Sequence, residues 1–324
     1  MIDLRYWSSW HNIVSKYLGD YTIIEVGNGF KDFVARIRKE IIEDYINDRI
    51  TDVGDFEVCE VTPPELILAY IGRHIDEMIS SEWYGKLEQG VNEFKKRYKY
   101  FFARADGVSA KDVYWWWIEY LGFRGLSKYG IIPVPGTMNN VCFLSEPINI
   151  VMVFVAGARM AKPDAGLDKI VLRAPYWFAH EWRVFVKDGK PRLISHYYYR
   201  EYKIRHLNEL IIMLEQSYAG KEDWLFWEIV GAVSEHVKDF TMDIAWVNEA
   251  WFRENGGLTS AQPMLVELNP FPIEEDPYYV WPGLFGKKFW KYLEKAVKKD
   301  MIIIKTPEEE EEITYKELEK AARR

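Results

Sequence analysis

The chain has 324 residues, of which 48% are apolar, so it is long enough to bury a sizeable core in one large domain or two lobes. Its formal net charge of -8 produces a field that repels duplex nucleic acid and anionic membranes, which excludes both as expected partners. Two widely separated cysteines, no signal-peptide core and no apolar run long enough for a membrane helix predict a soluble cytoplasmic protein.

Residues 1 to about 100 are predicted to be mainly helical. Apolar side chains recur close to the helical period in residues 30–45. A proline pair opens a second helix at residues 65–79, and a third helix at residues 82–98 ends in a basic run. We expect this region to carry specificity for a partner or substrate.

The pattern changes after the helical region. A short aromatic run at residues 99–105 predicts a strand, and the variant capping box at residues 109–112 starts another helix. Glycine and proline then predict a loop at residues 122–140, which is followed by strand-like segments in residues 141–156. A short strand is expected at residues 170–173.

Two hairpins are predicted in the second half of the chain. The first joins residues 181–186 to residues 191–198 through an Asp-Gly pair at 188–189, which is typical of a tight turn. The second joins residues 240–247 to residues 264–268 through a longer loop.

Helices are predicted around these hairpins. One long helix or a pair of helices covers about 204–238, and another covers residues 287–299. The acidic run at residues 308–312 is either a solvated face or a frayed tail.

The second hairpin carries the most informative polar pattern. Glu267 and Asn269 are two residues apart on a strand and therefore point to the same face, and Asp243 lies beside them if the strands pair. Two carboxylates and an amide oxygen are the ligands that hard cations such as Mg²⁺ prefer, completed by phosphate oxygens and water. The alternative is an ordinary polar sheet edge that faces water. Because clustered carboxylates repel each other without a metal, Asp243→Asn or Glu267→Gln is expected to leave the fold intact.

An Asp, a hairpin and an acidic residue two positions before Asn-Pro resemble the metal-binding signature of the ATP-grasp superfamily. The likeness is closest to the cell division cycle protein 123 family, in which the second strand ends Asp-x-Asn-Pro-Phe. Here Glu267 replaces the first of those residues, which keeps the charge and lengthens the reach. The resemblance implies that Asp243, Glu267 and Asn269 bind Mg²⁺.

Two further segments carry a second resemblance: Val-Leu-Arg at residues 171–173 and Glu-Trp-Arg-Val-Phe-Val at residues 181–186. They resemble the family's Val-Leu-Arg and Glu-Phe-Arg-x-Phe-Val, which implies that the first segment runs along adenine and supplies backbone hydrogen bonds. Glu181 and Arg183 alternate on one strand, so both can face one cleft, where the planar fork of Arg183 suits phosphate. The alternative is a surface cross-strand ion pair.

A third likeness lies in residues 101–112, which resemble the family's Phe-Pro-Lys-Leu-Asn followed by Ser-Pro-Lys-Asp-Ala. Aligned in this way, Arg104 takes the position of the family's phosphate-contacting lysine, and Lys111 and Asp112 match directly. A basic strand residue and the amides of a helix N-terminus can both reach a triphosphate. The alternative for Lys111 is a solvated lysine in a first helical turn.

Together the three likenesses imply an α+β ATP-grasp fold with the nucleotide between two lobes, and ATP and Mg²⁺ as cofactors. The predicted parts are a helical N-terminal region at residues 1–98, an N-terminal lobe at 99–165, a C-terminal lobe with the metal site at 166–305 and an acidic helical tail at 306–324. Arg183 and Lys111 are the implied catalytic residues. The implied nucleotide-binding residues are Arg104, Lys111, Asp112, Leu172, Arg173, Glu181 and Arg183.

The resemblance implies an ATP-dependent carboxylate–amine ligase that acts on a peptide or protein through an acyl phosphate. Such an enzyme needs no side-chain nucleophile, and the sequence has no nucleophile elbow, Walker A loop or dinucleotide fingerprint. The alternative is an ATP-binding assembly chaperone for a partner like translation initiation factor 2, the role of the cell division cycle protein 123 family. A phosphoryl transferase such as a kinase is an outlying alternative, because the same metal site would serve it.

Overall fold

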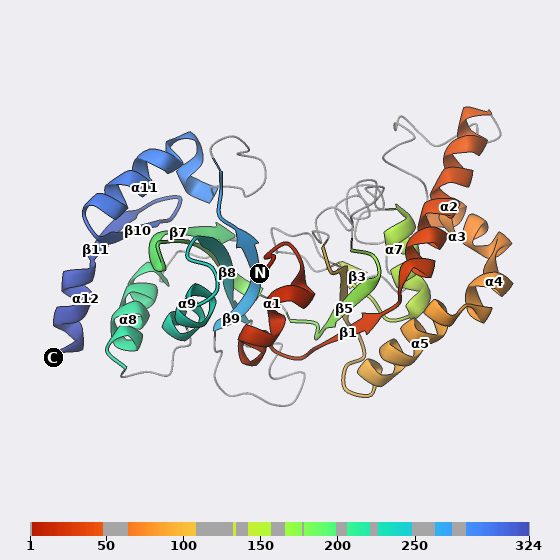
Figure 1. Cartoon of the computed structure of the whole chain (residues 1–324), viewed down its shortest axis with the longest axis horizontal. Helices are drawn as coiled ribbons and strands as arrows, with labels where there is room; N and C mark the ends of the chain where they lie inside the picture. The colour runs from red at the N-terminus through yellow and green to blue at the C-terminus, as the bar shows by residue number, and fades with distance from the viewer. Residues whose placement is uncertain are drawn as a thin grey trace. The chain divides into compact units, whose positions relative to one another are not determined.

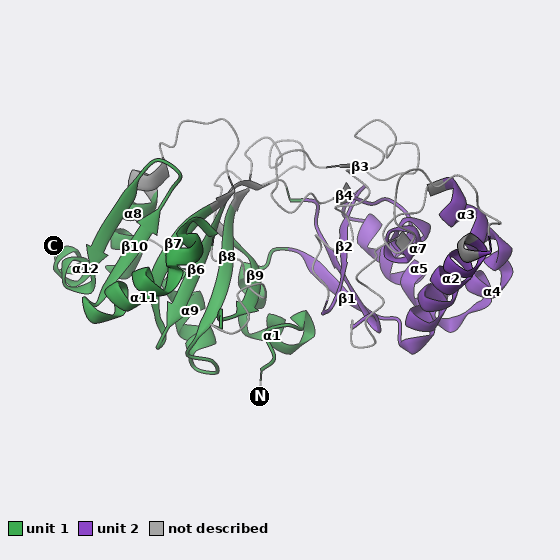
Figure 2. Cartoon of the chain, turned by 90° about the horizontal axis from the view of Figure 1, so that it is seen from above, with its two compact units in different colours: residues 1–19, 176–324 green, residues 20–175 purple. Residues whose placement is uncertain are grey.

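The structure, a computed structural model, describes residues 2–47, 64–107, 132–133, 142–156, 166–176, 178–198, 206–220, 226–247, 263–273 and 283–323. The chain divides into two compact units: unit 1 is Met1–Gly19 with Tyr176–Arg324, and unit 2 is Asp20–Pro175 (Figure 2). Each unit combines helices with a β-sheet, which confirms the predicted α+β class. The border after Pro175 places the strand at residues 169–173 in unit 2, whereas the sequence-based division begins the second lobe at residue 166.

The helices of unit 2 include α2 (Asn28–Ile46), α3 (Pro64–Arg73), α4 (Ile75–Ser80), α5 (Glu82–Lys95) and α7 (Pro147–Ala156) (Figure 1). α2 follows the predicted apolar period, because Phe33, Val34 and Ile37 are all buried. α5 begins after Ser81, whose hydroxyl accepts the N–H of Tyr84 as an N-cap. The three helices expected in this region are confirmed, with the second divided between α3 and α4.

Residues 147–156 are helical, so the prediction of strand-like segments throughout residues 141–156 is wrong there. The strand part is β4 (Cys142–Phe143), which pairs with β3 (Ile132–Pro133). A continuous apolar run has no alternation, so its pattern does not distinguish a buried strand from a buried helix. The helix begins at proline, which loses no hydrogen bond in the first turn, and the Asn149 side chain accepts the N–H of Glu146 at 2.8 Å.

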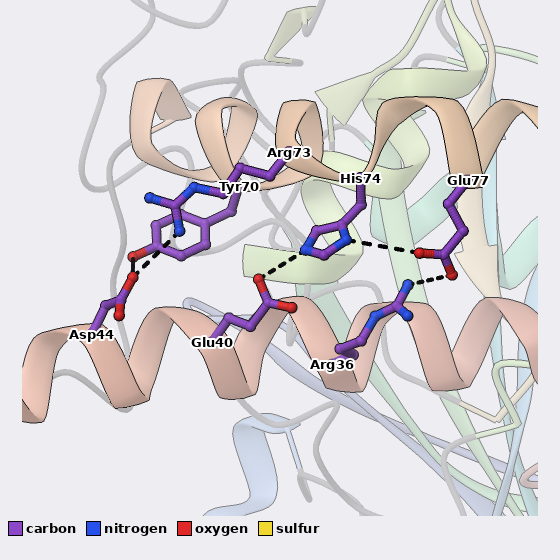
Figure 3. Close-up of polar contacts among 7 residues, drawn as sticks. All are labelled: Arg36, Glu40, Asp44, Tyr70, Arg73, His74 and Glu77. Carbon is purple, nitrogen blue, oxygen red and sulfur yellow. Dashed lines mark hydrogen bonds and ion pairs between the residues drawn. The ribbon is translucent and has the colours of Figure 1, made fainter.

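Polar contacts tie α2 to α3 and α4 (Figure 3). They join Arg36, Glu40 and Asp44 of α2 to Tyr70, Arg73, His74 and Glu77. His74 lies at the break between α3 and α4, with its Nε2 2.9 Å from a carboxylate oxygen of Glu40. Burial, and then the hydrogen bond that Tyr70 donates to Asp44, raise the pKa of Tyr70. Because these pairs are partly exposed, each adds little stability, and together they set how the helices align.

The three-stranded sheet of unit 2 has the order β1 (Tyr21–Glu25), β5 (Lys169–Arg173), β2 (Phe102–Ala105), and both pairings are antiparallel. The strands expected at residues 170–173 and 99–105 are confirmed, the latter over its second half. α5 packs against β1 where Gly90 meets the side chain of Ile24. A Cβ at this position would overlap Ile24, so the glycine allows the helix to approach the strand closely.

Unit 1 is built on a six-stranded sheet of order β11-β10-β7-β6-β8-β9. Its strands are β6 (Phe178–Lys187), β7 (Lys190–Tyr198), β8 (Phe240–Val247), β9 (Pro263–Pro270), β10 (Met301–Lys305) and β11 (Glu310–Thr314). Both predicted hairpins are confirmed as β6–β7 and β8–β9. Asp188 and Gly189 have φ angles of 54° and 73°, the left-handed pair that a tight type I′ turn requires.

The sheet of unit 1 is covered on both sides, with α11 on one side and α8 and α9 on the other (Figure 1). The helical segments are α1 (Trp7–Val14), η1 (Ser15–Tyr17), α8 (His206–Tyr218), α9 (Phe226–Ser234), η4 (Gly283–Lys288), α11 (Phe289–Lys298) and α12 (Tyr315–Ala322). Of the single long helix or the pair of helices expected in residues 204–238, the structure has the pair, and the helix expected at 287–299 is confirmed. Among the described helices, none is both long and apolar enough to cross a membrane.

The chain continues after α11 with two strands that the sequence pattern does not indicate. β10 pairs with β7 in parallel, and β11 pairs with β10 antiparallel. Residues 310–312 of β11 are exposed and Ile313 is buried, so the solvated-face interpretation of the acidic run is confirmed and the frayed tail is wrong. A run of glutamates has no alternation of apolar and polar residues, which is the pattern that would have predicted a strand.

α12 begins with a capping box, which provides a first test of the C-terminal segment. The Thr314 hydroxyl accepts the N–H of Glu317, and the Glu317 carboxylate accepts the N–H of Thr314 at 2.8 Å. Thr314→Ala is expected to lower the free energy of unfolding by about 1 kcal/mol, because it removes this cap. Thr314→Ser should retain most of the wild-type stability in chemical denaturation. Equal stabilities of the two variants would show that the cap contributes nothing.

Candidate functional site

One row of side chains crosses the sheet of unit 1. Arg183 on β6 pairs with Asp243 on β8, and Asp243 pairs with Glu267 on β9. Residues that pair across antiparallel strands project to the same face, so these three side chains lie next to one another. On the other side of Arg183, the row continues to Ser195 on β7. We refer to Ser195, Arg183, Asp243 and Glu267 as the polar row.

Arg183 and Asp243 form the strongest contact of the polar row. The Arg183 Nε donates to Asp243 Oδ1 at 2.7 Å, and Nη2 donates to Oδ2 at 2.6 Å. Their side chains are 6% and 0% exposed, respectively. A guanidinium and a carboxylate in this two-point geometry hold each other rigidly, and burial makes the loss of either one costly.

The structure gives Arg183 a different partner from the one considered in the sequence. The alternative interpretation, in which Glu181 and Arg183 form an ion pair at the surface, is wrong because both residues are buried. The ion pair of Arg183 is with Asp243, 60 residues further along the chain. Glu181 lies two residues before Arg183 on β6 and therefore on the same face.

Asn269 lies two residues after Glu267 on β9 and therefore on the same face of the sheet. Its Nδ2 donates to Glu267 Oε1 at 3.1 Å, and its strand partner on β8 is Thr241. Asp243, Glu267 and Asn269, the residues for which the sequence predicts a metal site, are therefore brought together on one face of the sheet. The pairing of β8 with β9 that this prediction assumed is present.

Several charged side chains belong to this face. Glu181, Asp243 and Glu267 bring three carboxylates to the face of the sheet that carries the Arg183 guanidinium. Within the described residues, no group of three or more His, Cys, Asp or Glu side chains is placed to hold a metal ion. The Asp243 and Glu267 carboxylates and the Asn269 amide are oxygen groups of the type that could bind a hard cation.

An apolar cluster fixes the strand that carries Arg183. Phe185, two residues after Arg183 on the same face, packs on Phe289 of α11 with ring centroids 4.8 Å apart. On the opposite face, the rings of Trp182 and His196 lie 4.4 Å apart. Since large side chains hold β6 from both faces, the Arg183 side chain starts from a rigid backbone.

Unit 2 carries the other predicted nucleotide residues that the structure describes. Arg104 on β2 pairs with Val171, and Arg173 lies two residues further along β5, so both guanidinium groups start from the same face of the sheet. Leu172 is buried and its strand partner on β1 is Thr22, so its backbone groups belong to the β1–β5 ladder. An adenine contact with the Leu172 backbone would therefore use the second lone pair of its carbonyl oxygen.

Two predicted site residues, Lys111 and Asp112, lie outside the described residues. Sequence reasoning in turn missed Ser195, which is fully buried at the end of the polar row. A single serine in a strand has no distinguishing pattern. The signal that identifies it is the register of β7 with β6, which follows from the tight turn at Asp188 and Gly189.

Comparisons with known proteins give structural likenesses. No protein-family model matches the sequence, and no curated protein matches it. The structure is similar to Cdc123 from Schizosaccharomyces pombe, with 11% identity and a TM-score of 0.45 over 87% of this chain and 91% of that one. For a C-terminally truncated Cdc123 from the same organism, the identity is 11% and the TM-score 0.43 over 83% and 87% of the two chains.

A further similar structure is D-alanine–D-alanine ligase from Bacillus anthracis complexed with ATP, with 12% identity and a TM-score of 0.25 over 71% and 73% of the two chains. At these identities, function has to be argued from the residues of this chain.

Proposed function

We propose that the chain binds Mg-ATP at the polar row and uses it to join a carboxylate to an amine. The observation that carries the proposal is the direct pairing of Arg183 with Asp243 and of Asp243 with Glu267. This pairing puts the rigid guanidinium of Arg183 beside the carboxylates of Asp243 and Glu267. A phosphate group that arrives with a divalent cation complements both parts of this arrangement.

Asp243, Glu267 and Asn269 would hold Mg²⁺, which when bound draws phosphate oxygens together and offsets their charge. Both carboxylate oxygens of Asp243 accept N–H groups of Arg183, which fixes the orientation of the guanidinium. A phosphate bound beside Asp243 would meet a positive charge that does not have to reorient. Arg183 therefore acts as a fixed electrostatic group.

The chemistry proposed for this site needs positioned charges and no protein nucleophile. A carboxylate oxygen of the substrate attacks the γ-phosphorus of ATP, and the bond to the β-γ bridging oxygen breaks to release ADP. The amine nitrogen then attacks the acyl carbon, the C–O bond breaks, phosphate leaves, and the nitrogen loses a proton. Arg183 and Lys111 would neutralise negative charge that builds up during phosphoryl transfer. Roles in binding the nucleotide are proposed for Arg104, Asp112, Leu172, Arg173 and Glu181.

Mg-ATP is expected to stabilise the protein against unfolding. At about 100 times its dissociation constant, a ligand adds roughly 2.7 kcal/mol to the free energy of unfolding. Glu267→Gln should weaken this effect and leave the ATP-free protein as stable as wild type, because it removes one of two neighbouring carboxylate charges. Thermal unfolding with Mg-ATP, and with ATP plus EDTA, measures both expectations.

The matched control for Glu267→Gln is Glu294→Gln, which alters an exposed glutamate on α11 of the same unit. This variant should respond to Mg-ATP as wild type does. If millimolar Mg-ATP does not change the unfolding temperature of the wild-type protein, the proposed binding of Mg-ATP is contradicted.

Product analysis separates joining from the other uses of ATP. A ligase forms ADP, phosphate and an amide only when a carboxylate and an amine are both present. A kinase would instead leave the γ-phosphate of labelled ATP on its acceptor, and an assembly chaperone would form no covalent product. Mass spectrometry of mixtures of peptide carboxylates and amines detects the amide, and Mg-ATP binding without any amide would reject the ligase assignment but retain the nucleotide site.

A further inference from the structure

The three-stranded sheet of unit 2 has an edge strand with an open side. β1 pairs with β5 along one side, and none of the described residues pairs with it along the other. Edge strands are usually protected by charged residues, proline or bulges, because their outer backbone groups can pair with another chain. In β1 the one charged residue is Glu25, at the strand's end.

The outward backbone groups of β1 follow from the hydrogen-bond pattern. The Ala174 N–H donates to the Asp20 carbonyl at 2.9 Å, so the pair of residues 20 and 174 exchanges hydrogen bonds. In an antiparallel ladder such pairs alternate with pairs that do not exchange hydrogen bonds. The backbone groups of Thr22 and Ile24 therefore point towards β5, and those of Ile23 and Glu25 point outwards.

The other side of β5 agrees with this assignment. The Asp106 N–H donates to the Lys169 carbonyl at 3.1 Å, so the odd-numbered residues of β5 bond to β2. The even-numbered residues must then bond to β1. The outward direction of the Ile23 and Glu25 backbone groups is thus supported from both sides of the central strand.

A groove of about 340 Å³ runs beside this open edge. One wall is β1, from Thr22 to Glu25, and the other wall is a single stripe of α5. The stripe consists of Lys86, Gln89, Gly90, Glu93, Phe94 and Arg97. Because a helix rises 1.5 Å per residue and a strand about 3.3 Å, residues 86–97 of the stripe extend about 18 Å and the five residues of β1 about 16 Å.

The charges along the groove are compensated within unit 2. Lys86 pairs with Glu82 at 2.7 Å, and Arg97 pairs with Asp20 at 2.6 Å. Glu93 pairs with Lys96 at 2.5 Å. An anionic or cationic ligand would have to break such pairs, whereas an uncharged extended chain can use the outward N–H and C=O groups of β1 directly.

We propose that β1 and the α5 stripe bind an extended, uncharged peptide segment of a partner protein, which adds as a fourth strand to the sheet of unit 2. The outward groups of Ile23 and Glu25 would supply main-chain hydrogen bonds, and alternate side chains of the peptide would lie along α5. This peptide site is separate from the polar row, and it operates without ATP.

Hydrogen exchange in the free protein tests the open edge. The amides of Ile23 and Glu25 should exchange much faster than those of Thr22 and Ile24, which donate to β5. Fast exchange at the outward pair supports the proposal. Slow exchange of the Ile23 amide in the free, monomeric protein would mean that another part of the chain covers the edge, and it would overturn the proposal.

A variant of the edge provides the binding test. Among the backbone groups, Ile23→Pro removes only the outward N–H, and proline is tolerated on an edge strand in this orientation. Thr22→Pro removes a ladder N–H instead and should destabilise the protein. Gln89→Trp fills the groove from an exposed position on α5 and provides a second variant that keeps the fold.

Peptides selected on the wild-type chain from a displayed library of random heptapeptides are the probe. The expected result is enrichment of peptides with alternating β-branched residues, whose affinity falls about tenfold or more with Ile23→Pro or with Gln89→Trp. The Glu267→Gln variant, and the wild-type chain in the presence of Mg-ATP, should bind the selected peptides with the same affinity as the wild-type chain alone. A failure of the peptide proposal can therefore be distinguished from a failure of the proposed nucleotide site. No enrichment, or binding that both variants retain, would overturn the proposal, as would a wild-type dimer that Ile23→Pro converts to monomer.

Discussion

Asp243→Asn is expected to lower the free energy of unfolding by about 3 kcal/mol or more, although it removes only one charge. Asp243 is fully buried and neutralises Arg183, whose side chain is 6% exposed. Asparagine is uncharged and cannot accept both N–H groups of Arg183, so the buried guanidinium loses its two-point partner, and breaking such pairs typically costs about 3–5 kcal/mol. Urea denaturation of the ATP-free protein measures the change.

The double replacement of the pair separates the cost of an unpaired charge from the value of the pair. Arg183→Met combined with Asp243→Leu removes both charges of the pair, so this protein should recover most of the stability lost in either single variant. It should still fail to bind Mg-ATP, because both proposed contacts are gone. A double variant as unstable as Asp243→Asn would indicate that the two residues stabilise the fold through other contacts.

This expectation reverses the one drawn from the sequence for Asp243. Repulsion between clustered carboxylates predicts that Asp243→Asn and Glu267→Gln both leave the fold intact. The structure retains that expectation for Glu267, which is half-buried and accepts a hydrogen bond from Asn269. For Asp243, the two hydrogen bonds from a buried guanidinium outweigh the repulsion of one neighbouring carboxylate.

Phe185→Ala is the second substitution with a large expected effect, a loss of about 3–5 kcal/mol in the free energy of unfolding. The Phe185 ring is fully buried and lies 4.8 Å from the ring of Phe289 and 6.4 Å from that of Phe285, measured between centroids. Its removal leaves a cavity between the sheet and α11, which β6 and the helix cannot close without moving. Calorimetry gives the loss, and hydrogen exchange should show faster opening of α11.

Trp290→Ala is the matched control for Phe185→Ala, because Trp290 lies on the exposed side of the same helix with 36% of its surface accessible. A substitution there should change stability by about 0.5 kcal/mol. Similar losses in the two variants would contradict the packing of α11 on β6. They would also remove the support that this packing gives to the position of Arg183.

Part of the candidate site could be predicted from sequence because it depends on local geometry. Glu267 and Asn269 share a face since any strand alternates its side chains, and the turn at residues 188–189 joins β6 to β7 because its residues accept positive φ angles. The helix α2 follows from its apolar period in the same way. Each of these features is encoded within a few consecutive residues.

For other elements, the local sequence pattern predicts the wrong secondary structure or none. The buried run of α7 is apolar on every side, so it has the composition of a strand and the geometry of a helix. β11 presents three glutamates to solvent, and its place in the sheet depends on pairing with β10. In both cases the deciding interaction is with residues distant in the chain, and it leaves no periodic trace in the segment itself.

The amino-acid sequence by itself determined the α+β class, the two hairpins and the oxygen-rich character of the residues on β8 and β9. Only the tertiary structure decided that Arg183 pairs with Asp243 and that β1 presents Ile23 and Glu25 at an open edge. The physical reason is register. Alternation fixes the face on which a side chain lies, whereas its neighbour across the sheet depends on how two distant strands align, which packing of the whole unit selects.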